Sequence, residues 1–122
     1  MRFRCERDVL GEALATAARA AQGRAGSQPV LAGVRLVLQG SRLEITGTDI
    51  ELTIQRTIEV NGEQDGACVV PGRLTAEAVR TLAPGAVTVD AGGDTVDITS
   101  DRSSFTVRPF AVDDFPRLAD PA

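Results

Sequence analysis

The sequence predicts an α+β domain made of an internally duplicated unit of one helix plus antiparallel strands, with two helices and about eight strands in all. The length of 122 residues fits one domain. Apolar residues alternate along several short runs and recur at helical spacing along two others. The chain also matches itself: residues 11–18 resemble 76–83, and residues 40–46 resemble 93–99. The offset falls from 65 to 53 residues, which predicts an extra loop in the first copy around residues 22–33.

The first copy is expected to contain a strand, a helix and three more strands. A strand around Phe3 and Cys5 leads into a helix that begins near Arg7, and residues 34–39 and 43–46 alternate as strands. A long strand follows over residues 50–60, and residues 61–66 end the copy as a turn. The helix has small and apolar residues at helical spacing, namely Leu10, Ala13, Leu14, Ala17 and Ala21. The long strand is expected to bury Ile50, Leu52, Ile54, Ile58 and Val60.

The second copy repeats this order. Residues 67–70 predict a strand, and Pro71-Gly72 starts a helix that turns Thr75, Val79 and Leu82 inward and stops at Pro84-Gly85. Strands follow over residues 87–90, 96–99 and 103–108. We expect the domain to span residues 1–110 and an acidic, proline-containing linker to begin over residues 111–122.

The composition excludes several classes of enzyme. The chain has no histidine, tryptophan, tyrosine or lysine, so its 13 basic residues are all arginines, set against 17 acidic residues. Without histidine, Ser-His-Asp and Cys-His hydrolysis and the usual histidine-ligated metals are excluded. Cys5 and Cys68 are too few for a disulfide framework or a zinc site, and Cys68 lies in an apolar run typical of a core. With no signal peptide and no long apolar run, we expect a cytoplasmic protein without cofactor or metal.

The positive charge gathers around the two predicted helices. Residues 1–24 carry a net charge of +2 and residues 72–83 a net charge of +1, in a chain whose total is −4. Arg73 and Arg80 are two helical turns apart and share an exposed face. Such a face suits contact with DNA phosphates, which requires no reading of base sequence. The alternative is a solvated helix face with an internal ion pair between Glu77 and Arg80.

Two other functions remain open at this point. Asp49 and Glu51 are two residues apart in a predicted strand and would project to one side, as the carboxylates of a metal-dependent nuclease do. A nuclease needs further carboxylates from other segments, and the sequence contains no second motif of this kind. The third reading is a protein-interaction or dimerisation module that pairs through a sheet edge without a role on DNA.

Several segments, in order along nearly the whole chain, resemble the first domain of the bacterial sliding clamp, the beta subunit of DNA polymerase III. They are Met1-Arg2-Phe3 with Glu6-Arg7, residues 29–34, Leu43 to Leu52 with the sequence LEITGTDIEL, Val70 to Leu74, Phe105 and Asp114 to Leu118. The resemblance implies a non-catalytic replication processivity factor. In that family, three domains form a subunit, and two subunits close head to tail into a ring around duplex DNA.

The resemblance also implies partners and site residues. The replicative polymerase and the clamp loader bind this family through later domains, so this chain is expected to be an excised or truncated domain, or else a stand-alone paralogue. The positions at which the family presents basic residues to DNA are Arg24, Arg73 and Arg80, with Arg7 and Arg19 as further candidates on the first helix. The implied subunit interface consists of Leu74, Ala78, Arg102, Ser103, Phe105 and Val107. Alternation leaves open whether Phe105 and Val107 face that interface or the core.

Overall fold

The computed structural model describes residues 1–21 and 29–116, and in this part of the chain it has two helices, two 3-10 helices and nine strands. The helices are α1 (Arg7–Ala18) and α2 (Gly72–Thr81), and the 3-10 helices are η1 (Pro29–Ala32) and η2 (Val112–Asp114). The strands are β1 (Arg2–Glu6), β2 (Gly33–Gln39), β3 (Arg42–Thr48), β4 (Thr53–Glu59), β5 (Asn61–Gln64), β6 (Gly66–Pro71), β7 (Ala86–Asp90), β8 (Val96–Thr99) and β9 (Ser104–Val107).

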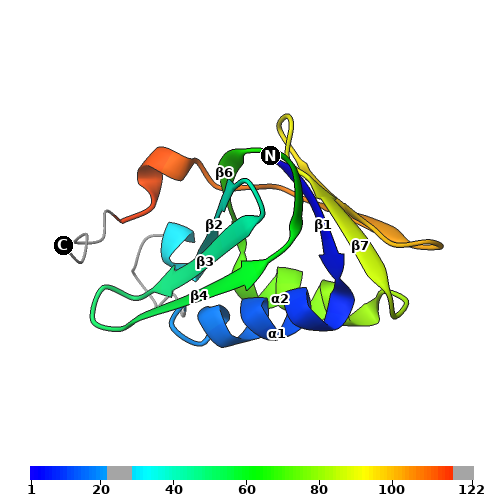
Figure 1. Ribbon diagram of the computed structural model, residues 1–122. Helices are drawn as coiled ribbons and strands as arrows, with labels where there is room; N and C mark the ends of the chain where they lie inside the picture. The colour runs from blue at the N-terminus through cyan, green and yellow to red at the C-terminus, as the bar shows by residue number, and fades with distance from the viewer. Residues whose placement is uncertain (22–28, 117–122) are drawn as a thin grey trace.

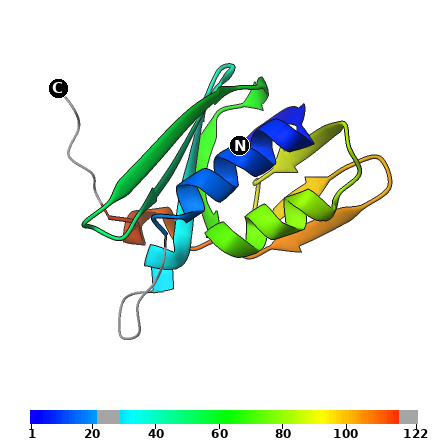
Figure 2. The same ribbon diagram turned by 90° about the horizontal axis from the view of Figure 1, so that it is seen from below.

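The strands form two antiparallel sheets (Figure 1). Sheet A has the order β5-β1-β7-β8-β9, and sheet B has the order β4-β3-β2-β6. Both helices lie on the same side of the molecule, and the view from that side shows α1 and α2 next to each other in front of the sheets (Figure 2). The α+β architecture with two helices is therefore confirmed.

The internal repeat is visible in the connections. β1, α1, β2, β3 and β4 follow the same order as β6, α2, β7, β8 and β9. β1 of the first copy pairs with β7 of the second, and β6 of the second copy pairs with β2 of the first, both antiparallel. The first strand of each copy therefore lies in the sheet formed by the other copy: β1 in sheet A and β6 in sheet B. The two copies thus fold as one unit.

The core lies between the helices and the sheets. From α1, the buried residues are Leu10, Gly11, Ala13, Leu14 and Ala17, which repeat at the spacing expected of one helix face. The sheets contribute a second layer that includes Phe3, Val34, Leu36, Leu43, Ile45, Val70, Val87, Val89 and Ile98. Burial of each large apolar side chain stabilises the fold by about 2 kcal/mol. This core holds the two helices in fixed positions relative to each other.

The structure has one strand beyond the about eight that were predicted, because β5 lies where a turn was expected. Residues Asn61–Gln64 are all exposed, so they lack the apolar alternation by which a strand is recognised in a sequence. β5 forms because it pairs with the edge of β1, where Phe3 lies opposite Gly62 and Arg4 opposite Asn61. Its formation depends on backbone hydrogen bonds to a distant segment and not on its own side chains.

The predicted start of the fourth strand was also wrong. β4 begins at Thr53, and the side chains of Ile50 and Leu52 are 73% and 51% exposed, although both were expected on a buried face. The preceding residues form a turn in which the Thr48 hydroxyl accepts a hydrogen bond from the Ile50 N–H (3.0 Å) and the Asp49 carboxylate accepts one from the Leu52 N–H (2.7 Å). Ile50 has a positive φ of 82°, which ends the alternation of a strand.

The C-terminal segment packs on sheet B as far as the structure describes it. Phe115, just after η2, is 5% exposed and forms a small second cluster with Val30 and Val69. The Phe110 N–H donates a hydrogen bond to the Val69 carbonyl (2.8 Å). Residues 111–115 therefore lie against the domain, while the boundary at residue 110 and the linker beyond it stay predictions, with residues 117–122 outside the described part.

Candidate nucleic-acid interface

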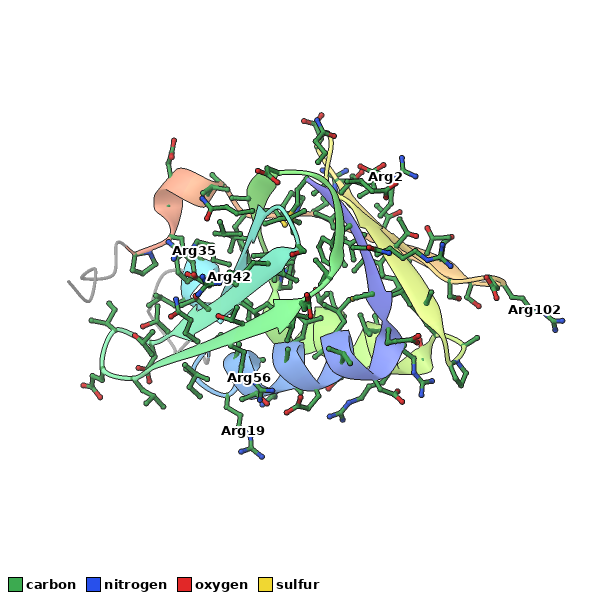
Figure 3. The ribbon with its side chains drawn as sticks, in the orientation of Figure 1. Arg2, Arg19, Arg35, Arg42, Arg56 and Arg102 are labelled. Carbon is green, nitrogen blue, oxygen red and sulfur yellow. The ribbon has the colours of Figure 1, made fainter. Side chains whose placement is uncertain are left out.

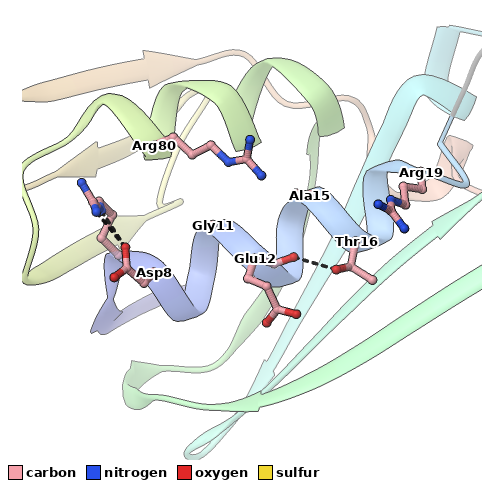
Figure 4. A pocket seen from close by; sticks show the side chains of 8 residues that line it. Asp8, Gly11, Glu12, Ala15, Thr16, Arg19 and Arg80 are labelled. Atoms are coloured by element: carbon pink, nitrogen blue, oxygen red, sulfur yellow. Dashed lines mark hydrogen bonds and ion pairs between the residues drawn. The ribbon is translucent and has the colours of Figure 1, made fainter.

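A groove runs between the two helices, and three arginines stand around it. Arg19 is the C-cap residue of α1, and Arg73 and Arg80 project from α2. Figure 4 shows the Arg80 side chain directed from α2 toward α1, with Arg19 near the far end of α1. Small side chains separate the arginines along the groove, namely Ala15, Ala18 and Ala76. The small residues let the helices approach closely, so the charged groups of this surface are the three guanidinium groups and the Glu77 carboxylate.

The two arginines of α2 are held outward by the opposite face of the helix. Thr75, Val79 and Leu82 are 1%, 0% and 3% exposed, as the helical spacing predicts. Arg73 and Arg80 are exposed and lie two turns apart on the other side. The packing of α2 against the core therefore fixes both charges toward the helix side of the molecule.

Arg19, Arg73 and Arg80 have no acidic partner among the residues that the structure describes. None of the three forms an ion pair or a side-chain hydrogen bond with another residue in the ranges 1–21 and 29–116. The Glu77–Arg80 pair expected for a merely solvated face is likewise absent among these residues. Three unmatched guanidinium groups beside one groove provide donors for an anionic ligand.

The acidic residues of α1 are matched by arginines of the domain itself. The Asp8 carboxylate accepts hydrogen bonds from Arg7 Nη2 (2.8 Å) and Nε (3.0 Å), and both oxygens of Glu12 accept bonds from Arg56 on β4 (2.8 and 3.0 Å). Arg7 also donates from Nη1 to the Leu82 carbonyl just past α2 (2.8 Å). Arg7 lines the groove but has a structural role there, since it joins the start of α1 to the end of α2.

Sequence reasoning missed Arg56 as a residue that acts on this surface. It lies 44 residues from Glu12, and no local pattern connects the two. The one available signal is the alternation of β4, in which Ile54, Arg56 and Ile58 are the half-buried positions and point to one side. Arg24, the remaining DNA-binding candidate, lies outside the described residues.

The candidate interface residues do not all lie on the surface. Leu74 on α2 is 58% exposed, Ala78 is half-buried, and Arg102 and Ser103 are exposed in the turn before β9. β9 is an edge strand of sheet A, so one side of its backbone is unpaired among the described residues. Two candidates point inward instead: Phe105 is partly buried against the core, and Val107 is 6% exposed within it.

The strand geometry proposed for a nuclease site is wrong. Asp49 and Glu51 lie in the turn between β3 and β4 and not side by side along a strand. The Asp49 carboxylate is engaged with the Leu52 N–H and stabilises that turn. In the part of the chain that the structure describes, no group of three or more Cys, Asp or Glu side chains is placed to hold a metal ion.

The two cysteines are unsuited to nucleophilic chemistry. Burial, with a smaller contribution from the Glu6 charge, raises the pKa of Cys5 to about 12, and burial raises the pKa of Cys68 to about 12 as well. Both thiols therefore stay protonated at neutral pH, whereas the thiolate is the reactive form. Cys68 packs in the core, as its apolar surroundings in the sequence predict.

The described residues contain no helix that is both long enough and apolar enough to cross a membrane.

The chain is 35% identical over 118 residues to the beta sliding clamp of Streptomyces coelicolor and 34% identical over 118 residues to that of Micrococcus luteus. Each alignment covers 97% of this chain but only 31% and 38% of the relative, so the chain spans about a third of their length.

Solved structures of sliding clamps are also similar to this chain over about a third of their length. The DNA polymerase sliding clamp of Caulobacter crescentus superposes with a TM-score of 0.91 at 27% identity, over 99% of this chain and 33% of the clamp. A DnaN sliding clamp from Pseudomonas aeruginosa, solved with griselimycin, gives a TM-score of 0.90 at 26% identity, over 100% of this chain and 33% of the clamp. The family described as DNA polymerase III beta subunit, N-terminal domain, matches residues 1–119. The chain belongs to this family of sliding-clamp N-terminal domains.

Proposed function

We propose that this chain is the DNA-contacting N-terminal domain of a sliding clamp, a non-catalytic processivity factor that encircles duplex DNA and tethers the replicative polymerase. The observation that carries the proposal is the groove between α1 and α2, where Arg19, Arg73 and Arg80 are unmatched within the described residues. In a ring whose helices line the hole, these guanidinium groups face the phosphates. Membership of the clamp family supports the same function.

The physics of this surface suits a sliding contact. Arginines that meet phosphates bind without reading base sequence, because their affinity comes from released counterions and falls as salt rises. A few such contacts suffice when a closed ring prevents escape. The rest of the chain is acidic, with a net charge of −4 for the whole sequence, which discourages DNA from binding elsewhere on the domain.

The assembly that we propose is a head-to-tail ring of two subunits, each with three domains of this kind, in the bacterial cytoplasm. The polymerase and the clamp loader would bind through the domains that follow. This chain spans about a third of the length of its relatives, which supports a subunit of three such domains. Exposed residues on α2 and beside the edge strand β9 would form this domain's part of the subunit interface.

The proposal is tested with a chimeric ring. In the Streptomyces coelicolor clamp, the matched 118-residue stretch is replaced by that of this chain. After loading onto a nicked circular plasmid, we expect the chimera to comigrate with the DNA in gel filtration and to be released when the plasmid is linearised. The unmodified clamp is the control. A chimera that forms a dimer but is not retained on the circle contradicts the proposal.

The same chimera tests the subunit interface. We expect Leu74→Glu to raise the dimer dissociation constant by at least about tenfold, because a carboxylate would enter an apolar contact. The fold is expected to persist, since Leu74 is 58% exposed in the isolated domain. Val9→Glu is the matched control: Val9 is an exposed aliphatic residue on the other helix, at 43%. If sedimentation gives equal dimer dissociation constants for the two variants, Leu74 of α2 does not contribute to the interface.

A further inference from the structure

The ion pair between Arg56 and Glu12 connects the outer edge of sheet B with the helix face. Arg56 Nη1 lies 2.8 Å from Glu12 Oε1 and Nη2 lies 3.0 Å from Oε2, a bidentate arrangement of a planar guanidinium with a carboxylate. Figure 3 shows Arg56 on the side of β4 that faces α1. The Arg56 and Glu12 side chains are 37% and 61% exposed, so the pair stays in contact with solvent.

Glu12 is well placed to oppose DNA binding. It lines the same groove as Arg19 and Arg80 and is seven residues from Arg19 on α1, or about 10 Å along the helix axis. This separation is close to the screening length at about 0.1 M salt, so an uncompensated carboxylate here would weaken the attraction of phosphates. Figure 4 shows the Glu12 side chain pointing away from α2, on the flank of α1 next to sheet B.

We infer that Arg56 is a positioning residue for DNA contact: it neutralises Glu12 and holds the carboxylate on the sheet side of α1, away from the arginines of the groove. This inference rests on the proposed function and assigns part of the electrostatics of the helix face to a residue of the sheet. Asp8 has an arginine partner in Arg7, so both acidic residues of α1 that line the groove are paired.

The pair is expected to contribute only weakly to stability, because both side chains remain in contact with solvent although their geometry is bidentate. Exposed ion pairs contribute little to folding, and the β4 strand is already held by its ladder with β3 over seven residue pairs. Removing Arg56 is therefore expected to leave the fold intact and to change the charge of the helix face alone. This separation makes the inference testable in the isolated chain.

The test measures association of the chain with a fluorescent duplex of random sequence as salt is varied. We expect Arg56→Gln to weaken association by about threefold to tenfold at low salt, because it leaves Glu12 unpaired, and we expect the difference to shrink as salt rises. Adding Glu12→Gln in the same chain should restore association to within about twofold of the parent, since the local charge is then balanced again. Arg56→Lys should restore most of it.

Arg42→Gln is the matched control. Arg42 is an exposed arginine of sheet B, on β3, and its loss changes the net charge by the same amount without leaving Glu12 unpaired. Thermal melts of all variants report on folding. If Arg56→Gln and Arg42→Gln behave alike, or if Glu12→Gln fails to rescue, the inference is wrong while the proposed function stands. If the parent chain itself shows no salt-dependent association with DNA, the inference is wrong, while the proposed function is decided separately by the retention of the chimeric ring on circular DNA.

Discussion

Replacing Gly47 with alanine is expected to destabilise the domain by about 3 kcal/mol or more, one of the largest effects available to a single methyl group. A Cβ at this position would lie 2.0 Å from the Ala17 carbonyl oxygen, far inside any permitted contact. Neither partner can move easily. Gly47 lies in β3, between Val34 of β2 and Ile54 of β4, and Ala17 lies in the last turn of α1.

Urea unfolding followed by circular dichroism measures this effect. We expect the midpoint of Gly47→Ala to fall well below that of the parent, because the loss is a large part of the about 5–15 kcal/mol by which a domain of ordinary stability is folded. Gly93→Ala is the control, since a Cβ there would meet no atom within 4 Å. That variant is expected to unfold near the parent's midpoint. Coincident transitions for the two variants would mean that α1 does not approach β3 as closely as the structure shows.

The parts of the fold that the sequence predicted correctly are those governed by local periodicity. The faces of α1 and α2 follow from residues such as Leu10, Leu14, Thr75 and Val79, because a helix buries one stripe against the core. The internal match also predicted the repeated order of elements. The exchange of β1 and β6 between the sheets was not predictable, because both copies would give the same pattern with their strands unexchanged.

The errors concern segments whose structure depends on distant partners. β5 has no buried residue, so only its pairing with β1 makes it a strand. Ile50 and Leu52 continue an apolar alternation and were expected to be buried. A turn forms there instead, in which the Thr48 hydroxyl donates to the Leu52 carbonyl and the Asp49 carboxylate accepts from the Leu52 N–H, and both apolar side chains stay exposed. An alternation of apolar and polar residues is typical of a strand, but it does not show where a turn interrupts that strand.

The candidate site shows the same division. The exposure of Arg73 and Arg80 follows from the amphipathic pattern of α2. The pairing of Glu12 with Arg56 does not, because it joins a helix to an edge strand 44 residues away. The inward position of Val107 was equally undecidable, since the alternation of β9 fits either face until its partner β8 is placed.

Removing the two groove arginines of α2 together is expected to abolish most of the chain's association with duplex DNA. For Arg73→Ala with Arg80→Ala, we expect affinity at low salt to fall by roughly tenfold or more, and the slope of log affinity against log salt to decrease by about 1 to 2. The fold should be unchanged, because both side chains are exposed and unpaired within the described residues. Titration of a fluorescent duplex at several salt concentrations measures both quantities.

The control must separate a local contact from the general loss of charge. Arg42→Ala with Arg102→Ala lowers the net charge by the same two units, and both residues are exposed and lie away from the helix pair (Figure 3). If DNA meets the groove between α1 and α2, the control keeps nearly the parent's salt slope while the Arg73 and Arg80 variant loses it. Equal losses in both variants would show that DNA binding depends on the total charge of the chain and not on this face. An unchanged slope in the Arg73 and Arg80 variant would show that these arginines are only solvated, and the DNA contact would have to be assigned to other residues.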